Sequence, residues 1–392
     1  AADWIVAQPW SNGAIGATGI SYLGAASDFL LTTGHPAVKA IAPLFAVFDT
    51  WLENCYPGGV LLASRLAGRD GQLMAALDRD QREDRKRYAY FKDPNLAGPQ
   101  PVDEDPDGEI CRAAVADHFS NFNMVDFISE FRFYDSTLPY DPTVTPAVMG
   151  PSHYSASSTP GAAVYCVSGW MDGAAYSNGS ISRFLTYREE RPTHLLLGPW
   201  DHGARSNVSY WKAGDVPEFP LYAELLRFFD HYLGGRPNGF EAEAPIHYFS
   251  MHDELWRSAE DWPLATRTMT LYPGEGKTLV PDRPEPGEDN YQVDFSVGTG
   301  RFSRYERASG YENNTFYPDW KARQDRYLTY TSEPLKTDLT LAGHVELSLD
   351  FRSTQPDAAI FGYLSELEPD GTLRYITEGV LRALHRAEAE PP

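Results

Sequence analysis

The chain has 392 residues, of which 42% are hydrophobic and 22% charged, a composition that suits a globular protein with a sizeable core. Its 33 Lys and Arg against 55 Asp and Glu give a formal net charge of -22, which argues against a nucleic-acid or anionic-membrane partner. No apolar run approaches the roughly 20 residues of a membrane span, and no secretory signal pattern opens the sequence.

The first segment, residues 1–65, alternates helical and strand patterns. The expected elements are, in order, a helix over 3–10, a turn over 11–13, a strand over 14–19, a helix over 22–34 and a strand over 38–46. This alternation favours a parallel sheet of the α/β class. Because Ala1 already lies inside a pattern, we expect that upstream sequence is missing and that the α/β domain is incomplete at its N-terminal end.

Residues 66–144 change character and predict a helical cap inserted into the α/β domain. Two helical stretches, the first of them highly charged, lie on either side of a connector rich in Pro and Asp; they cover 65–91 and 109–134, and the connector covers 93–109. The α/β pattern then returns over 145–238. Apolar runs over 161–173 and 192–203 predict two further strands, and 221–235 predicts a helix that ends at glycine.

From residue 239 to 392 the texture is that of an all-β domain. Short alternating or β-branched runs are separated by Pro, Gly and Asp turns; they lie at 244–251, 266–273, 325–332, 343–351, 358–367 and 374–383. Many short strands without helices predict a β-sandwich, which we expect to be incomplete because the chain ends soon after a strand.

Signals for metals and disulfides are weak. Cys55, Cys111 and Cys166 are far apart and odd in number, which predicts buried thiols or one accidental pair rather than a disulfide framework or a zinc site. The run from Asp103 to Ala114 begins like a calcium loop, but Ala114 stands where a bidentate Glu is expected, so an acidic surface loop is favoured. We expect neither a metal nor a cofactor.

A candidate nucleophile, Ser21, lies in the turn between the strand over 14–19 and the following helix. A strand, a sharp turn and a helix with small residues close by is the setting of a nucleophile elbow. Gly19 fits the G-x-S-x-G pattern, but its second glycine would fall at Leu23 and stands at Gly24 instead. The alternative is an ordinary tight turn with a helix-capping serine.

Two partners follow in the order of an α/β-hydrolase, first an acid and then a histidine. A serine hydroxyl needs an imidazole to take its proton, and the imidazole needs an acid to orient it. Asp172 and His202 each come just after an apolar run, on the sheet edge where Ser21 is expected. Taken alone, Asp172 is more often a turn residue than a catalytic acid, because Asp-Gly favours turns. Asp201 is a competing acid, although its position next to His202 disfavours contact with the ring.

The segments around these residues resemble the cocaine-esterase-like (CocE/NonD) hydrolases. The resemblance rests on AQPWSNGAIGATGISYLG, VSGWMDG, LLLGPWDHG and LLRFFDHYLGGRPNG, and on the C-terminal HVELSLDFRSTQPDAAIFGYLSELEPDG. It implies an α/β-hydrolase core over 1–65 and 145–238, a variable cap over 66–144 and a jelly roll over 239–392. This family is related to Xaa-Pro dipeptidyl-peptidases (family S15), α-amino-acid ester hydrolases and glutaryl cephalosporin acylases.

The resemblance also assigns roles. Ser21 becomes the nucleophile of a family elbow spelled G-x-S-Y-x-G, Asp172 the orienting acid and His202 the base. The backbone N–H of Tyr22 becomes one oxyanion donor. The second donor, a tyrosine hydroxyl, is expected on an upstream segment, so we expect this chain alone to have weak or no activity, since losing one donor costs about 10²–10³ in kcat.

Four aromatic residues are candidates for a substrate pocket because they follow strand ends or lie in adjoining loops; they are Phe48, Trp51, Tyr56 and Trp170. Core packing is the even alternative, because aromatic residues make up 13% of the chain.

The sequence therefore predicts a serine hydrolase that acts on a small-molecule ester or amide. An Xaa-Pro dipeptidyl-peptidase or a β-lactam or glutaryl acylase is the alternative within this class, and a non-catalytic jelly-roll binding protein is the alternative outside it. The oligomeric state stays open, with a homo-oligomer as one option. The location also stays open, because an export signal would precede Ala1. Of the possible locations, the cytoplasm is slightly favoured.

Overall fold

The computed structural model describes residues 1–63, 102–118, 128–173, 175–204, 207–214, 219–264, 267–298, 303–305, 317 and 320–387. The helix expected over 65–91 lies outside these residues, and the helical stretch expected over 109–134 is described in part.

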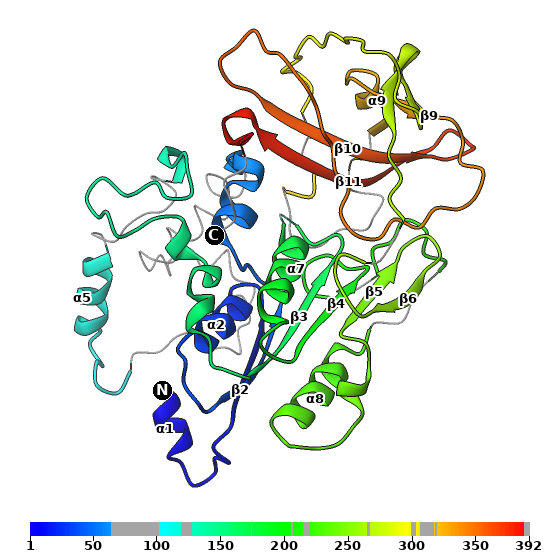
Figure 1. Ribbon diagram of the computed structural model, residues 1–392. Helices are drawn as coiled ribbons and strands as arrows, with labels where there is room; N and C mark the ends of the chain where they lie inside the picture. The colour runs from blue at the N-terminus through cyan, green and yellow to red at the C-terminus, as the bar shows by residue number, and fades with distance from the viewer. Residues whose placement is uncertain are drawn as a thin grey trace.

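A six-stranded sheet forms the centre of the α/β domain, with its strands side by side in chain order (Figure 1). The strands are β1 (Ile15–Ile20), β2 (Val38–Leu44), β3 (Ala163–Gly169), β4 (Thr193–Gly198), β5 (Ile246–Ser250) and β6 (Leu255–Ala259). The first five are parallel to their neighbours, and β6 is antiparallel to β5. The central strands β3 and β4 are buried along their whole length, as expected for parallel strands covered on both faces.

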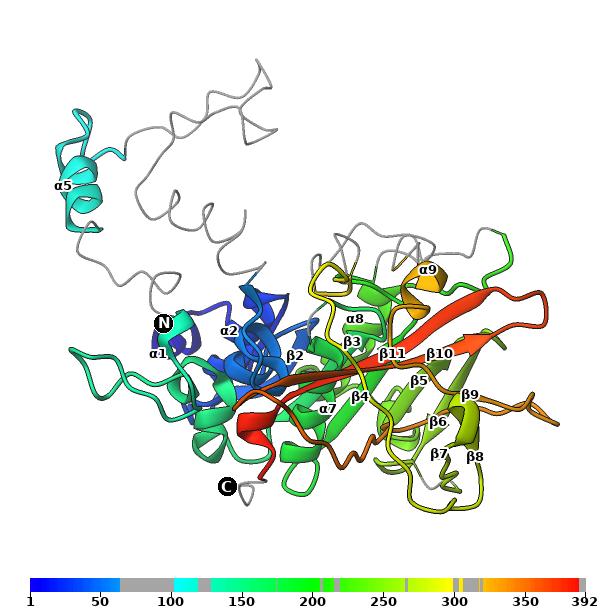
Figure 2. The ribbon, with the colours of Figure 1, turned by 90° about the horizontal axis from the view of Figure 1, so that it is seen from above.

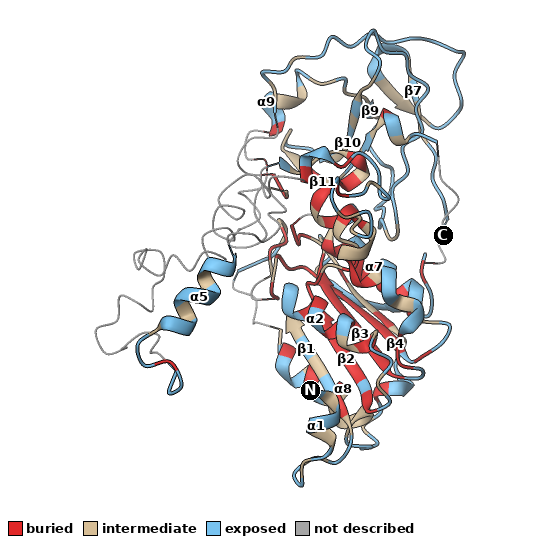
Figure 3. Cartoon of the chain, turned by 90° about the vertical axis from the view of Figure 1, so that its left-hand side faces the viewer, coloured by how far each residue is buried: buried red, intermediate tan, exposed pale blue. Residues whose placement is uncertain are grey.

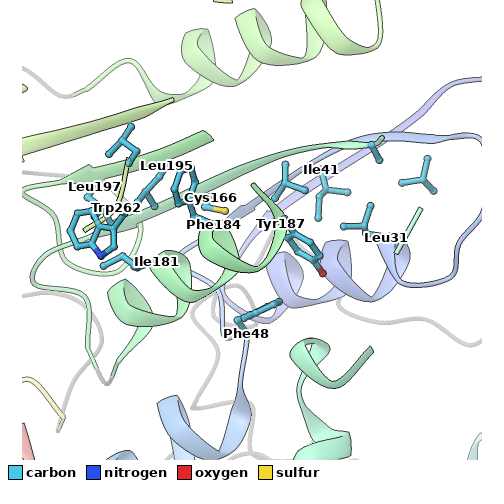
Figure 4. Packing of buried hydrophobic residues seen from close by; sticks show 14 of the residues in the cluster. Leu31, Ile41, Phe48, Cys166, Ile181, Phe184, Tyr187, Leu195, Leu197 and Trp262 are labelled. Carbon is cyan, nitrogen blue, oxygen red and sulfur yellow. The ribbon is translucent and has the colours of Figure 1, made fainter. Parts of the chain in front are cut away.

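Helices cover both faces of this sheet. On one face, α2 (Tyr22–Leu31) and α7 (Tyr176–Tyr187) pack their apolar side chains onto β2, β3 and β4, as Figure 4 shows for Leu31, Phe184 and Cys166. On the other face, α8 (Leu221–Tyr232) buries Leu221, Leu225 and Phe228. These three residues recur at helical spacing, which turns one stripe of α8 toward the sheet.

The remaining helical elements are short. They are α1 (Ala2–Val6), the π-helix η1 (Trp51–Cys55), η2 (Pro57–Gly59), α5 (Glu109–Asp117), η6 (Ile128–Glu130), η7 (Ala147–Met149), η8 (Pro151–Ser157), η9 (Phe240–Ala242), η10 (Glu275–Lys277), α9 (Trp320–Gln324) and η13 (Ala383–His385). In the loop weighed as a calcium site, the Asp105 carboxylate accepts the N–H groups of Ile110 and Cys111 at 3.0 and 2.9 Å. That carboxylate thus supports the first turn of α5.

The region after the core sheet carries two smaller sheets. One contains β7 (Tyr272–Gly274), β8 (Thr278–Val280) and β9 (Thr331–Ser332), and the other is a hairpin of β10 (Ala359–Leu367) and β11 (Leu373–Arg382). Seen from above, the hairpin runs across the molecule next to α7 and the core sheet (Figure 2). The hairpin packs closely against the loop after β2. A Cβ added at Gly58 in this loop would lie only 1.7 Å from the Val380 carbonyl oxygen of β11.

Two expectations about this region differ from the structure. The run over 244–251 forms β5, which pairs with β4 and so extends the core sheet, whereas the sequence pattern assigned it to the sandwich. The run over 343–351 forms no strand, and its Val345, Leu347 and Leu349 side chains are exposed. Figure 3 shows this contrast between a buried sheet and a largely exposed C-terminal part. A strand exists only where its backbone pairs with a neighbour, and an alternating pattern does not encode that neighbour.

Candidate active site

Ser21 occupies a strained turn between β1 and α2. Its backbone angles are φ 66° and ψ -129°, a conformation that a non-glycine residue adopts at a cost of about 1–3 kcal/mol. Its N–H donates to the Leu44 carbonyl at 2.9 Å, which fixes the turn to the end of the neighbouring strand β2. The serine side chain is half-buried at the carboxyl end of the parallel strands. Strain of this kind holds a side chain in a position that a relaxed turn would not provide.

The two glycines around Ser21 are required by close packing. A Cβ on Gly19 would lie 2.4 Å from the Leu23 Cβ, and a Cβ on Gly24 would lie 2.6 Å from the Ala46 Cβ and 2.7 Å from the Gly19 carbonyl oxygen. The glycine one position later than the usual spacing therefore serves the close approach of α2 to β1 and β2. This contact explains why position 23 tolerates leucine, whose side chain is exposed.

Asp172 and His202 are brought together from the ends of β3 and β4. The Nδ1 atom of His202 lies 2.9 Å from Oδ1 of Asp172, whose side chain is fully buried, while the imidazole is 15% exposed. The other carboxylate oxygen, Oδ2, accepts a hydrogen bond from the Ser168 hydroxyl at 3.1 Å. The sequence offered two acids, Asp172 and Asp201. The contact of Asp172 with His202 favours a single tautomer of the imidazole, in which Nδ1 carries the proton.

The imidazole also meets the segment that anchors Ser21. The Phe45 ring, one residue after Leu44, contacts the His202 ring edge-on at a centroid distance of 6.0 Å, and the Tyr176 ring lies 5.4 Å from it on the side of α7. Ser21, Asp172 and His202 thus follow the ends of β1, β3 and β4, and Phe45 follows the end of β2. The carboxyl ends of neighbouring parallel strands meet at one edge of a sheet, which is where α/β domains bind ligands.

The four aromatic residues expected at a pocket are divided between packing clusters. Phe48 lies in the main core, and Trp51 stacks on Tyr56 with ring centroids 4.0 Å apart in a separate cluster. The half-buried Trp170 donates its indole N–H to the Phe249 carbonyl at 2.8 Å. These positions fit the core-packing alternative, and a pocket role for them stays a prediction.

Sequence reasoning missed a buried ion pair beneath the site. Arg183 of α7 and Asp28 of α2 have fully buried side chains whose Nη2 and Oδ2 atoms lie 2.9 Å apart. The same Nη2 donates to the carbonyls of Ala46 and Val47, each at 3.2 Å. One guanidinium therefore ties together the helix after Ser21, the segment after β2 and the helix after Asp172. A charged residue on the apolar face of each helix was the available signal.

A second buried acid, Glu53 of η1, adjoins this ion pair. Burial raises the pKa of Glu53 to about 8 and that of Asp28 to about 6, although Arg183 opposes both shifts. The Glu53 carboxyl accepts the N–H groups of Phe48 and Asp49 at 2.9 and 2.8 Å. These bonds hold the turn that follows β2.

Other site types find no support in the part of the chain that the structure describes. Within those residues, no group of three or more His, Cys, Asp or Glu side chains is arranged to hold a metal ion. None of the described helices has both the length and the apolar character needed to cross a membrane. Cys55 and Cys166 are buried, and none of the three cysteines forms a disulfide.

Comparisons with known proteins match the whole chain. Residues 1–204 match the family model of the X-Pro dipeptidyl-peptidase (S15 family), and residues 238–392 match that of the X-Pro dipeptidyl-peptidase C-terminal non-catalytic domain. A Mycobacterium bovis protein named as a serine esterase is 38% identical over 100% of this chain, and the cocaine esterase of a Rhodococcus species is 23% identical over 98% of it.

A solved structure shares the fold. The crystal structure of an aminopeptidase from a marine sediment archaeon, Thaumarchaeota archaeon, superposes with a TM-score of 0.62 at 19% identity, covering 98% of this chain and 64% of that one. The fold is therefore that of an α/β-hydrolase-like domain followed by a C-terminal non-catalytic domain. The chain spans 64% of the length of the mycobacterial relative and 68% of the Rhodococcus esterase.

Proposed function

Since the chain belongs to the X-Pro dipeptidyl-peptidase (S15) family of hydrolases, to which the cocaine-esterase-like proteins are related, we propose that it cleaves a carboxylic ester or amide bond with Ser21 as its nucleophile. The observation that carries this proposal is the hydrogen bond of 2.9 Å between His202 and a fully buried Asp172, on the sheet edge where Ser21 stands in a strained turn.

The reaction follows from the chemistry of these groups. With its proton on Nδ1, the imidazole of His202 presents Nε2 as a base, which takes the proton of the Ser21 hydroxyl as Oγ attacks the substrate carbonyl. The carboxylate of Asp172 stabilises the imidazolium that forms. His202 then gives the proton to the leaving alcohol or amine, and water releases the acyl group by the same route in reverse.

The negative oxygen that forms during attack needs hydrogen-bond donors. Tyr22 is the first residue of α2, and the first N–H groups of a helix have no acceptor within it. We assign the Tyr22 N–H as one oxyanion donor, a role that its side chain, 76% exposed, does not share.

Reaction of Ser21 with a fluorophosphonate probe tests this proposal. We expect the chain to be labelled, Ser21→Ala to lose the label and Ser11→Ala, at a serine in the turn after α1, to keep it. Asp172→Asn should slow labelling by up to about 10⁴, since it leaves the geometry but favours the wrong tautomer. A chain that stays unlabelled even when it is extended upstream of Ala1, or a label that survives in Ser21→Ala, would contradict the proposal and favour a non-catalytic binding protein.

The bond cleaved is the finer question. The name of the mycobacterial relative favours an ester, whereas the family description favours an Xaa-Pro amide. We propose ester cleavage on a small molecule, with a dipeptidyl-peptidase or acylase activity as the alternative. Rates on p-nitrophenyl esters, phenylglycine methyl ester and Xaa-Pro nitroanilides separate these activities. A preference for the nitroanilide would overturn the ester assignment.

We also propose the finer architecture, a helical cap over 66–144 and a jelly roll in the C-terminal region that follows β6. The helix α5 supports the first, and the two small sheets β7–β9 and β10–β11 support the second.

A further inference from the structure

The loop that carries Asp172 is held from both sides by backbone hydrogen bonds. On the side of β4, its Trp170 N–H donates to the Gly198 carbonyl at 2.9 Å and its Met171 N–H donates to the Trp200 carbonyl at 3.0 Å. The acid loop and the segment leading to His202 are therefore joined through backbone N–H groups. Its carbonyl groups point elsewhere, and buried carbonyl groups need donors.

Those donors come from the C-terminal region. Arg304, a buried residue in the region that matches the C-terminal non-catalytic domain, donates from Nη2 to the carbonyl oxygens of Trp170 at 2.8 Å and Asp172 at 3.3 Å. These contacts join residues 134 and 132 positions apart in the chain. A planar guanidinium suits this task, because its N–H groups are fixed relative to one another.

Arg304 is itself embedded in the C-terminal region. Its Nη1 reaches the Tyr375 hydroxyl at 3.5 Å, and the Glu378 carboxyl of the same strand, β11, accepts the Tyr317 hydroxyl at 2.7 Å. Burial raises the pKa of Glu378, and the nearby charge of Arg304 opposes this shift, so the two groups interact. A buried arginine with a nearby acid keeps its guanidinium in one position, unlike an exposed side chain at the surface.

Apolar contacts reinforce the same junction. The Met171 side chain packs in one buried cluster with Tyr317, Trp320 and Tyr375 of the C-terminal region. The acid loop is thus one place where the C-terminal region packs against the hydrolase core.

We propose that Arg304 is a positioning residue for the Asp172–His202 pair, so that the C-terminal region sets the geometry of the site without touching substrate. This inference rests on the proposed function for its catalytic meaning, but the hydrogen bond between Asp172 and His202 can be observed without any turnover. Loss of Arg304 removes this donor from the carbonyls of Trp170 and Asp172. A displacement of about 1 Å there costs up to roughly a hundredfold in rate.

The test combines a spectroscopic signature with labelling. The Nδ1 proton of His202, bonded to Asp172, should give a far-downfield proton resonance in the 392-residue chain that disappears in His202→Gln. We expect Arg304→Met to broaden or shift this resonance in chains that circular dichroism shows to be folded, and to slow fluorophosphonate labelling about ten- to a hundredfold. The matched control is Arg374→Met, which removes a half-buried arginine of β11 paired with Glu368 at 2.8 Å and should leave both readouts unchanged.

The outcomes separate the two proposals. An unshifted, sharp resonance and an unchanged labelling rate in folded Arg304→Met overturn the positioning role. If Arg304→Met does not fold, Arg304→Lys decides, because it keeps the charge and loses the fork; a resonance unaltered there also overturns it. A wild-type chain that shows the resonance but is not labelled at Ser21, even when it is extended upstream of Ala1, contradicts the proposed function alone.

Discussion

Replacing Arg183 by methionine should destabilise the protein far more than the same change at a surface ion pair. Arg183 and Asp28 are both fully buried, and the arginine makes two bonds from Nε to the carboxylate, at 3.1 and 3.0 Å, besides its contacts to two carbonyls. Removing one partner of a buried pair leaves an uncompensated group and costs about 3–5 kcal/mol in the free energy of unfolding.

The pH dependence of this loss follows from the pKa of Asp28. Burial already raises that pKa from 3.8 to about 6 with Arg183 present. A raised pKa in the folded state means that the folded chain binds more protons, so stability falls as pH rises through the window from 3.8 to about 6. Without Arg183 the upper end of the window moves to higher pH. The destabilisation of Arg183→Met relative to wild type should therefore grow between pH 5 and pH 8.

Urea unfolding followed by tryptophan fluorescence at both pH values measures these differences. The control is Arg236→Met, since the Arg236 side chain is 71% exposed and its pairing with Asp230 at 2.9 Å should contribute at most about 1 kcal/mol. The double variant Asp28→Leu with Arg183→Met should recover stability over Arg183→Met alone, because neither partner of the ion pair is then left buried without the other. If Arg183→Met loses no more than Arg236→Met, the assignment of a structural ion pair beneath the site is refuted.

Three further changes test single features of the structure. Gly24→Ala should lower the free energy of unfolding by about 1–3 kcal/mol despite the better helix propensity of alanine. Gly287→Ala should leave it unchanged, because no atom lies within 4 Å of the added Cβ. Equal stability of the two variants in urea would refute the close-packing account of the elbow. His194→Gln should flatten the pH dependence of the free energy of unfolding, because burial lowers the pKa of His194 from 6.5 to about 4. In wild type, the stability that neutral His194 contributes is lost as pH falls through that window, by about 2 kcal/mol between pH 7 and pH 5. An unchanged dependence of stability on pH in His194→Gln contradicts this. Ser168→Ala should lower the free energy of unfolding by about 1–2 kcal/mol, since it removes one hydrogen-bond donor to the Asp172 carboxylate. It should also slow fluorophosphonate labelling less than Asp172→Asn does. A larger effect on the labelling rate than that of Asp172→Asn would count against the assignment of Asp172 as the orienting acid.

Local patterns in the sequence determined the core of this protein. The strand–turn–helix around Ser21 and the apolar runs before Asp172 and His202 each lie within one short segment, and the structure places them as β1–α2, β3 and β4. Side-chain periodicity, glycine positions and chain order are properties that a single segment carries by itself. For that reason the candidate triad, the α/β class and the hydrolase relationship were all available before any coordinates.

The tertiary structure alone decided which distant groups meet. The run at 246–250 joined the core sheet, the run at 343–351 formed no strand, and Arg304 reached the loop of Asp172 from more than a hundred positions away. The ion pair of Asp28 and Arg183 could not be predicted from either helix, because a charged side chain on an apolar helix face is explained only by its partner on another helix. Strand pairing and buried charge are relations between segments, and their energy depends on a neighbour that local sequence does not specify.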